Sequence, residues 1–204
     1  FIYLPETDFD QEAFLKDLEK AFETNCNLIV CVSEGIHDAE GTFICEYDSS
    51  VGIDTFGHKM LAGCGKYLEN LVRSRLGVKA RSVELNVSQR CSAAMISATD
   101  QQEAVAAGKF GVQAALNGET GKMVSFIREA DADGNYQMVC GLEDVNEICN
   151  QEKVVPAEWI TPDGHDVTED FVRYARPLIQ GNVNVPLGED GTRSFFVVCH
   201  CVCV

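Results

Sequence analysis

Two arginines bound a short stretch that could bind a phosphate group. Arg81 and Arg90 stand at the ends of Arg-Ser-Val-Glu-Leu-Asn-Val-Ser-Gln-Arg, where an apolar alternation gives way to Ser88 and Gln89. The pattern predicts a short strand and the turn that leaves it. A guanidinium group presents a planar set of donors that matches phosphate oxygens. Solvated arginines flanking a strand are an equally good interpretation of this stretch taken alone, so both remain open here.

A carboxylate follows the first long apolar run. Residues 27–32, Asn-Leu-Ile-Val-Cys-Val, are typical of a strand buried on both faces of a parallel sheet, and Glu34 comes just after them. Ligands of open α/β sheets bind at the carboxyl ends of the strands. There Glu34 could accept hydrogen bonds from sugar hydroxyls. A solvated or helix-capping glutamate is the alternative, with equal weight.

Charge and length restrict the function further. The 204 residues carry a formal net charge of −16, which argues against nucleic acid or an anionic membrane as a partner. Residues 66–90 nevertheless hold six basic residues against Glu69 and Glu84, so a small anion would be drawn there. No apolar run approaches the roughly 18 to 20 residues that cross a bilayer. We therefore expect a soluble, cytoplasmic protein.

The cysteines and the start of the chain add two expectations. Ten cysteines lack the regular spacing of a disulfide framework, so we expect reduced thiols. Cys199, Cys201 and Cys203 alternate and could hold a soft metal, but a terminal edge strand is the favoured interpretation. The chain opens inside an apolar run, Phe-Ile-Tyr-Leu, with no initiator Met, and we expect a fragment.

The first half of the chain is predicted to be a strand-helix-strand unit with a further helix and strand. Strands are expected at residues 1–4, 27–32 and 79–85. Phe14, Leu15, Leu18 and Phe22 give the apolar stripe of a helix between the first two strands. A helix over residues 67–76 should end at Gly77, a glycine suited to the left-handed conformation after a helix.

The second half combines helices with a hairpin. Asp100 and Glu103 resemble a capping box that opens a helix rich in alanine. Residues 123–127 and 136–142 are predicted strands joined by Asp-Ala-Asp-Gly-Asn, which fits a hairpin turn better than a calcium loop. A short helix over 144–149 and a helix capped by Thr168 follow. Gly63-x-Gly65 and Gly118–Lys122 do not fit nucleotide-binding loops.

Taken in order, several motifs resemble the phosphofructokinases, and more closely their pyrophosphate-dependent branch. The likeness covers about residues 1–185 and rests on the following segments: Leu4-Pro5-Glu6, Phe9-Asp10, Val32-Ser33-Glu34-Gly35, Phe56-Gly57-His58, Arg81 through Gln89-Arg90, Gly118 through Val124, and Arg176 through Gly181. The resemblance implies an α/β fold, a Rossmann-like open parallel-sheet domain that is incomplete at the N-terminus. Residues 1–90 would form the later part of the sugar-phosphate-binding domain, and residues 91–204 would return to the phosphoryl-donor domain.

The resemblance also implies a substrate site. Glu34 matches the residue that accepts hydrogen bonds from the hydroxyls of fructose 6-phosphate, and Arg90 matches an arginine on its 6-phosphate. Arg81 matches a second phosphate-binding arginine, which the family donates across a subunit interface, so a homo-oligomer is expected. Val87 stands where the family has His or Tyr. Either Ser88 or Asn86 compensates for this valine, or the affinity for the phosphate is lower; Gln89 is a further residue of the expected site.

The implied activity is reversible phosphoryl transfer from pyrophosphate to the 1-hydroxyl of fructose 6-phosphate, a glycolytic reaction. The donor loop, the ligands of Mg²⁺ and the catalytic base match segments upstream of this chain, so no catalytic residue and no metal ligand is assigned and the chain alone is expected to be inactive. Two alternatives remain open: a non-catalytic or regulatory subunit that assembles with an active one, and an ATP-dependent 6-phosphofructokinase.

Overall fold

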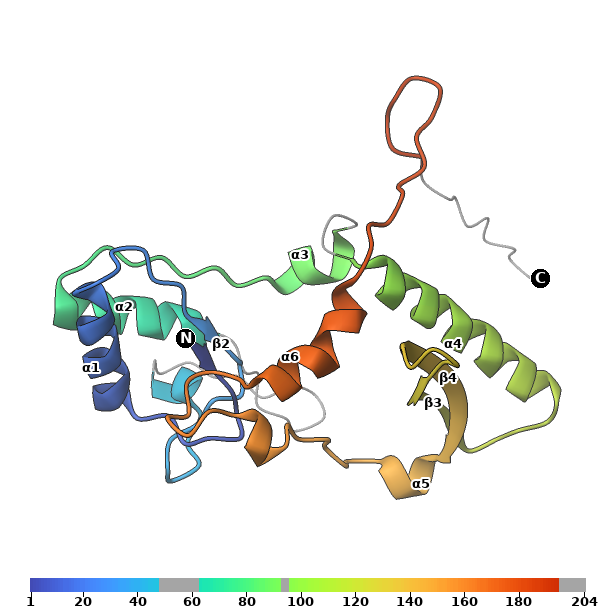
Figure 1. Ribbon diagram of the computed structural model, residues 1–204, viewed down its shortest axis with the longest axis horizontal. Coiled ribbons are helices and arrows are strands. Elements are labelled where there is room, and N and C mark those ends of the chain that lie inside the picture. The colour runs from blue at the N-terminus through green and yellow to red at the C-terminus, as the bar shows by residue number, and fades with distance from the viewer. Residues whose placement is uncertain (48–62, 93–95, 195–204) are drawn as a thin grey trace, which may run out of the picture. The chain divides into compact units, whose positions relative to one another are not determined.

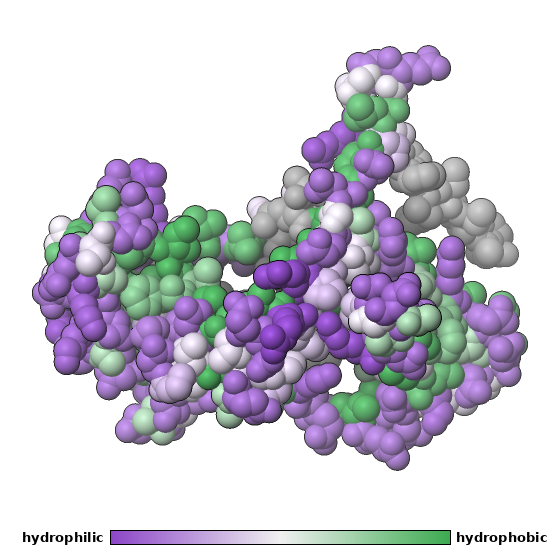
Figure 2. Space-filling view, viewed as in Figure 1, coloured by the Kyte–Doolittle hydropathy of each residue, from purple (hydrophilic) through white to green (hydrophobic). Residues whose placement is uncertain are grey.

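The computed structural model describes residues 1–47, 63–92 and 96–194 (Figure 1). The chain forms two compact units. The first unit consists of residues 1–85 and 152–174, and the second consists of residues 86–151 together with the residues from 175 onward. Hydrophilic residues occupy much of the face seen in Figure 2, as expected for a chain with a formal net charge of −16.

The first unit opens with the predicted strand-helix-strand arrangement. Strands β1 (Ile2–Tyr3) and β2 (Cys31–Val32) pair in parallel, with Ile2 opposite Cys31. Helix α1 (Gln11–Phe22) connects them. It begins at Asp10, whose carboxylate accepts hydrogen bonds from the backbone N–H groups of Glu12 (2.8 Å) and Ala13 (2.9 Å). This cap satisfies two donors that the first helical turn leaves without partners.

The core of the first unit lies between α1 and α2 (Cys64–Leu76). The apolar stripe predicted for α1 is buried at Phe14, Leu15 and Leu18. Helix α2 contributes its own buried face and ends at Gly77, whose φ of 67° is the left-handed conformation expected there. The buried side chains of this core are Tyr3, Phe9, Phe14, Leu15, Leu18, Ile36, Ile44, Cys45, Cys64, Leu68 and Val72.

The predicted strand at residues 27–32 is shorter and less buried than expected. Only its last two residues form β2, and Ile29 is 78% exposed. Leu28 and Val30 pack against the core, so the segment has one buried face and one open face. A strand is covered on both faces only where layers lie on both sides of the sheet. The described residues supply one such layer.

The strand predicted at residues 79–85 is absent, and this part of the prediction was wrong. Val83 is 81% exposed and Leu85 is 45% exposed. Among the described residues, β1 and β2 form a two-stranded sheet without a third strand. Alternating apolar residues form a strand only where a neighbouring strand accepts their backbone hydrogen bonds.

The side chain of Glu69 holds the segment 79–85 in place of a neighbouring strand. The carboxylate of Glu69 on α2 accepts hydrogen bonds from the backbone N–H of Ser82 (2.9 Å) and from its hydroxyl (2.7 Å). Lys66 donates to the same carboxylate at 2.8 Å, and Arg73 does so at 3.3 Å. The hydrogen bonds from Lys66 and Ser82 lower the pKa of Glu69 to about 2.

We expect Glu69 to contribute to the free energy of unfolding in a way that is lost in acid. A carboxyl whose pKa is lowered on folding stabilises the protein above its unfolded pKa of about 4.3, and that contribution is lost as the pH falls toward the folded pKa. We therefore expect the free energy of unfolding of Glu69→Gln to vary less between pH 4.5 and pH 2 than that of the parent chain. Urea unfolding at a series of pH values measures this difference. Parallel curves for the two proteins would contradict it.

The second unit contains two helices and a hairpin. Helix α3 (Asn86–Cys91) comes first and is followed by α4 (Ala98–Leu116). Strands β3 (Lys122–Ala130) and β4 (Tyr136–Asp144) then pair in antiparallel fashion, with Lys122 opposite Asp144. A short helix, α5 (Val145–Ile148), follows β4. The predicted hairpin and short helix are thus confirmed.

The turn of the hairpin behaves as predicted. The carboxylate of Asp131 accepts hydrogen bonds from the backbone N–H groups of Asp133 (2.9 Å) and Asn135 (2.8 Å). Gly134 has a φ of 83°, a conformation that glycine adopts without steric cost. The aspartate therefore closes the turn through its own backbone contacts, and these contacts occupy an oxygen that a calcium loop would direct at the ion.

One predicted helix cap was placed wrongly, and a second lies at the predicted residue but lacks the expected side-chain contact. Helix α4 begins after Ser97, whose hydroxyl accepts a hydrogen bond from the backbone N–H of Asp100 at 3.0 Å, so the cap lies three residues before the predicted one. Thr168 does precede α6 (Glu169–Ala175). Its hydroxyl, however, is buried and has no hydrogen-bond partner among the described residues. Each segment contains several residues that can cap a helix. The sequence pattern alone chose the wrong residue for α4 and the right residue, without its expected contact, for α6.

Three 3₁₀ turns complete the described structure: Ile44–Tyr47, Ala157–Trp159 and Arg176–Ile179. The last lies in the second unit beside the start of α4, where the backbone N–H of Ala98 donates to the carbonyl of Gly181 at 3.1 Å. No helix in the described parts of the chain is long and apolar enough to cross a membrane.

Candidate substrate site

Glu34 lies where the apolar run predicted it. It follows β2 in the turn between Ser33 and Gly35, at the carboxyl end of the strand, and its side chain is exposed. The next residue, Ile36, is completely buried and anchors the turn to the core. An exposed carboxylate held at this position can accept hydrogen bonds from a ligand without first losing a partner in the protein.

Arg81 lies in the same unit, on the extended segment that Glu69 fastens to α2. Its side chain is exposed. Between Glu34 and Arg81 there is no hydrogen bond or ion pair, although both residues are described. The neighbouring arginines of α2 have partners: Arg73 pairs with Glu69, and Arg75 pairs with Glu12 at 2.9 Å. This agrees with their interpretation as helix-surface residues rather than anion ligands.

The remaining predicted residues belong to α3 instead of a turn after a strand. Asn86 has a φ of 37° and begins this helix. Val87, 69% exposed, and Ser88, also exposed, follow it. The backbone of Gln89 and Arg90 continues the helix. Positions 87 and 90 are therefore about one helical turn apart, whereas a strand would have put them on opposite faces.

The predicted site thus divides between the two units. Glu34 and Arg81 belong to the first, and Val87, Ser88, Gln89 and Arg90 belong to the second. The joint site remains a prediction. His58 of the Phe56-Gly57-His58 motif, and Cys199, Cys201 and Cys203 of the tail, lie outside the described residues.

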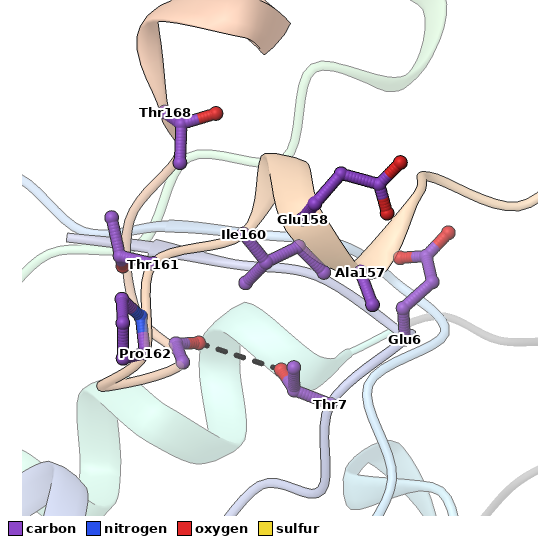
Figure 3. A pocket seen from close by; sticks show the side chains of 9 residues that line it. Glu6, Thr7, Ala157, Glu158, Ile160, Thr161, Pro162 and Thr168 are labelled. Carbon is purple, nitrogen blue, oxygen red and sulfur yellow. Dashed lines mark hydrogen bonds between the residues drawn. The ribbon is translucent and has the colours of Figure 1, made fainter.

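A pocket of about 500 Å³ lies in the first unit, near the end of β1 (Figure 3). One carboxylate oxygen of Glu6 accepts a hydrogen bond from the backbone N–H of Val155 at 2.8 Å. The other oxygen is buried without a partner among the described residues, as is the hydroxyl of Thr168. The hydroxyl of Thr7 donates to the carbonyl of Gly164 at 3.4 Å. The pocket is lined by Glu6, Thr7, Ala157, Glu158, Ile160, Thr161, Pro162, Gly164 and Thr168.

The chemistry of this pocket does not suit a sugar phosphate. Its lining contains the carboxylates of Glu6 and Glu158 and no basic side chain, so a phosphate group would be repelled. The contacts of Glu6 and Thr7 fasten the later segment of the unit to its first strand. In the sequence, Glu6 is distinguished only as part of the Leu4-Pro5-Glu6 motif. Its long-range contact to Val155 has no local signature in the sequence.

The described residues contain no group of three or more His, Cys, Asp or Glu side chains placed to hold a metal ion. No chemical step is assigned to a metal in this part of the chain.

The chain is similar to known enzymes along most of its length. No protein-family model matches the chain. The pyrophosphate–fructose 6-phosphate 1-phosphotransferase of Methylococcus capsulatus is 34% identical over 199 residues, which are 98% of this chain and 46% of that relative. The enzyme of the same name from Xanthomonas campestris is 35% identical over 93% of this chain and 44% of that relative.

Solved structures give the same result. The pyrophosphate-dependent phosphofructokinase of Marinobacter aquaeolei superposes with a TM-score of 0.72 at 28% identity, covering 93% of this chain and 42% of that one. The α/β fold is therefore that of the phosphofructokinases, and the chain belongs to the phosphofructokinase family. The members that it matches over nearly its whole length are the pyrophosphate-dependent phosphotransferases. The chain spans slightly less than half the length of these relatives.

Proposed function

We propose that this chain supplies the sugar-phosphate-binding part of a pyrophosphate-dependent phosphofructokinase. The reaction would transfer a phosphoryl group from pyrophosphate to the 1-hydroxyl of fructose 6-phosphate, reversibly. The observation that carries the proposal is the 34% identity to the Methylococcus capsulatus enzyme along 98% of the chain. Four relatives that match 87% to 98% of the chain are all named pyrophosphate–fructose 6-phosphate 1-phosphotransferase, which favours pyrophosphate as the donor.

Each proposed residue has a role that follows from its chemistry. Arg90 binds the 6-phosphate through its guanidinium fork. Glu34 accepts hydrogen bonds from sugar hydroxyls at the carboxyl end of β2. Arg81 contributes a second cation, to the site of a neighbouring subunit in a homo-oligomer. Ser88 and Gln89 offer polar groups beside Arg90 in the sequence. Together these groups hold the acceptor sugar, and phosphoryl transfer depends chiefly on such positioning and on charge stabilisation.

The remaining parts of the reaction belong to the portion of the family's fold that this chain does not span. That portion would supply the pyrophosphate-binding loop, the ligands of Mg²⁺ and the base that accepts the proton of the 1-hydroxyl. When bound, Mg²⁺ would neutralise charge on the transferring phosphoryl group. We place the complete enzyme in the cytoplasm, where the thiols of this cysteine-rich chain stay reduced.

A binding measurement tests the sugar-phosphate assignment. The chain is titrated calorimetrically with fructose 6-phosphate, with fructose and with inorganic phosphate. We expect fructose 6-phosphate to bind more tightly than either part, because Arg90 and Glu34 contact different ends of it. The assignment would be overturned if fructose 6-phosphate bound no more tightly than inorganic phosphate.

We expect a substitution at Val87 to raise the affinity for fructose 6-phosphate. Valine cannot donate a hydrogen bond to the 6-phosphate, and its exposed position on α3 leaves room for a larger side chain. In a hybrid in which this chain replaces the matching part of the Methylococcus capsulatus enzyme, Val87→His should lower the KM for fructose 6-phosphate by about fivefold, the worth of one hydrogen bond. Val87→Leu is the matched control. An unchanged or higher KM for the histidine variant would remove position 87 from the site.

A further inference from the structure

Arg81 lies on a segment that has little support from backbone contacts. Residues 78–85 connect α2 to α3 without forming a helix or a strand (Figure 1). Within the described parts of the chain, the backbone groups of residues 79–83 form no hydrogen bond with another backbone group. A segment without such bonds samples many conformations. The position of Arg81 therefore depends on contacts made by side chains.

Glu69 on α2 provides such a contact. Its carboxylate accepts hydrogen bonds from the backbone N–H of Ser82 at 2.9 Å and from the hydroxyl of the same residue at 2.7 Å. The side chain of Glu69 is only 10% exposed, so water competes weakly for these hydrogen bonds. We call this pair of hydrogen bonds the Glu69–Ser82 clamp. It fixes the residue that directly follows Arg81.

The surface of α2 allows Ser82 to approach closely. Gly65 precedes Glu69 by four residues and therefore lies on the same face of the helix. A Cβ atom at position 65 would lie 3.4 Å from the Cβ atom of Ser82. Ser82 thus packs against α2 one turn away from its hydrogen-bond partner, and the clamp joins two parts of the chain that are already in contact.

The cations around the clamp differ in what they can still bind. Lys66 and Arg73 donate to the carboxylate of Glu69, at 2.8 Å and 3.3 Å. Arg81, by contrast, is exposed and has no ion-pair partner within the described parts of the chain. The clamp therefore lies beside a guanidinium group that is available to an anion.

We propose that Glu69 and Ser82 are positioning residues for Arg81. Neither contacts the substrate. The clamp fixes the backbone next to Arg81 and so limits the directions in which its guanidinium group can reach the phosphate of fructose 6-phosphate. A group that is already held in place loses less conformational freedom on binding, and the affinity is higher for that reason. The inference rests on the proposed function, because it takes Arg81 as a ligand of the phosphate.

The experiment compares two side chains of similar shape at position 82. Thr and Val are both β-branched, but only Thr keeps a hydroxyl that can donate to Glu69. Fructose 6-phosphate is titrated calorimetrically into the hybrid with the Methylococcus capsulatus enzyme, where Arg81 can act across the subunit interface. We expect Ser82→Val to bind it about fivefold more weakly than Ser82→Thr, the worth of one hydrogen bond. Ser74→Ala is the control: Ser74 is exposed on α2 and its hydroxyl donates to the carbonyl of Leu71, so its affinity should equal that of the parent hybrid.

A second background separates positioning of Arg81 from a general effect on the fold. Once Arg81→Ala has removed the guanidinium group, the clamp has nothing left to position. In that background Ser82→Val and Ser82→Thr should bind fructose 6-phosphate with equal affinity, because the effects of two residues that act through one contact are not additive.

The outcomes distinguish this inference from the proposed function. Equal affinities of the Thr and Val variants in the hybrid that keeps Arg81 would overturn the positioning role alone. The same difference between them with and without Arg81 would overturn it too, since the clamp would then act on the fold and not through Arg81. If Arg81→Ala bound fructose 6-phosphate as tightly as the parent hybrid, or if the parent hybrid did not bind it, the proposed role of Arg81 would fail and the positioning role with it.

Discussion

Replacing Arg90 by alanine is expected to weaken the binding of fructose 6-phosphate by about 10- to 100-fold. A hydrogen-bonded contact to a charged group contributes about 1.5 to 3 kcal/mol, and each 1.4 kcal/mol corresponds to a factor of ten. The binding of fructose, which lacks the phosphate, should change little. Calorimetric titration of the variant with both sugars measures the two effects side by side.

Two further variants make this prediction specific. Arg193→Ala removes an exposed arginine from the same unit, at a position outside the proposed site, and should leave both affinities unchanged. Arg90→Lys keeps the charge but loses the planar fork, so it should fall between the parent and alanine. An equal loss for fructose and fructose 6-phosphate on Arg90→Ala would mean that Arg90 does not contact the phosphate.

Phe14→Ala is expected to cost about 3 to 5 kcal/mol of folding free energy in the first unit. Phe14 is 2% exposed, and its ring lies 5.5 Å from that of Tyr3 and 5.3 Å from that of Phe9, measured between centroids. Truncation would leave a cavity among these aromatic rings. Since a typical domain is stable by about 5 to 15 kcal/mol, the variant should lose a large share of its stability.

The single tryptophan of the chain reports on this effect. Trp159 lies in the first unit, 5.1 Å from Tyr174 between ring centroids. Urea unfolding followed by its fluorescence gives the free energy of unfolding of that unit. Ile29→Ala is the matched control: Ile29 is 78% exposed, and the change should stay within about 0.5 kcal/mol. Similar losses for the two variants would contradict the assignment of the core.

The sequence predicted local periodicity well and sheet partners poorly. The stripe of Phe14, Leu15 and Leu18 and the glycine after α2 are local features, and the structure confirms them. The strand at residues 79–85 was predicted from alternation alone. Whether such a segment becomes a strand depends on a neighbouring strand, which is remote in the sequence. Ser82 instead found a partner in Glu69, thirteen residues away, through a side chain that no periodicity reveals.

For the candidate site too, the sequence predicted local features and not the contacts that depend on remote residues. Glu34 follows a buried segment, so its position at the end of β2 could be inferred from the apolar run. The region around Val87 was predicted to be the turn that follows a strand, but it forms part of α3. The roles of Arg81 and Arg90 came from the order of motifs that resemble the phosphofructokinases. Two guanidinium groups alone are equally compatible with a solvated surface.

Turnover by the hybrid enzyme tests the central claim most directly. This chain replaces the matching part of the Methylococcus capsulatus enzyme, and the formation of fructose 1,6-bisphosphate from fructose 6-phosphate is followed with pyrophosphate or with ATP and Mg²⁺. We predict turnover with pyrophosphate, little or none with ATP, and a strongly raised KM for fructose 6-phosphate on Arg90→Ala. Turnover with ATP alone, or a folded and assembled hybrid that acts on neither donor, would contradict the account.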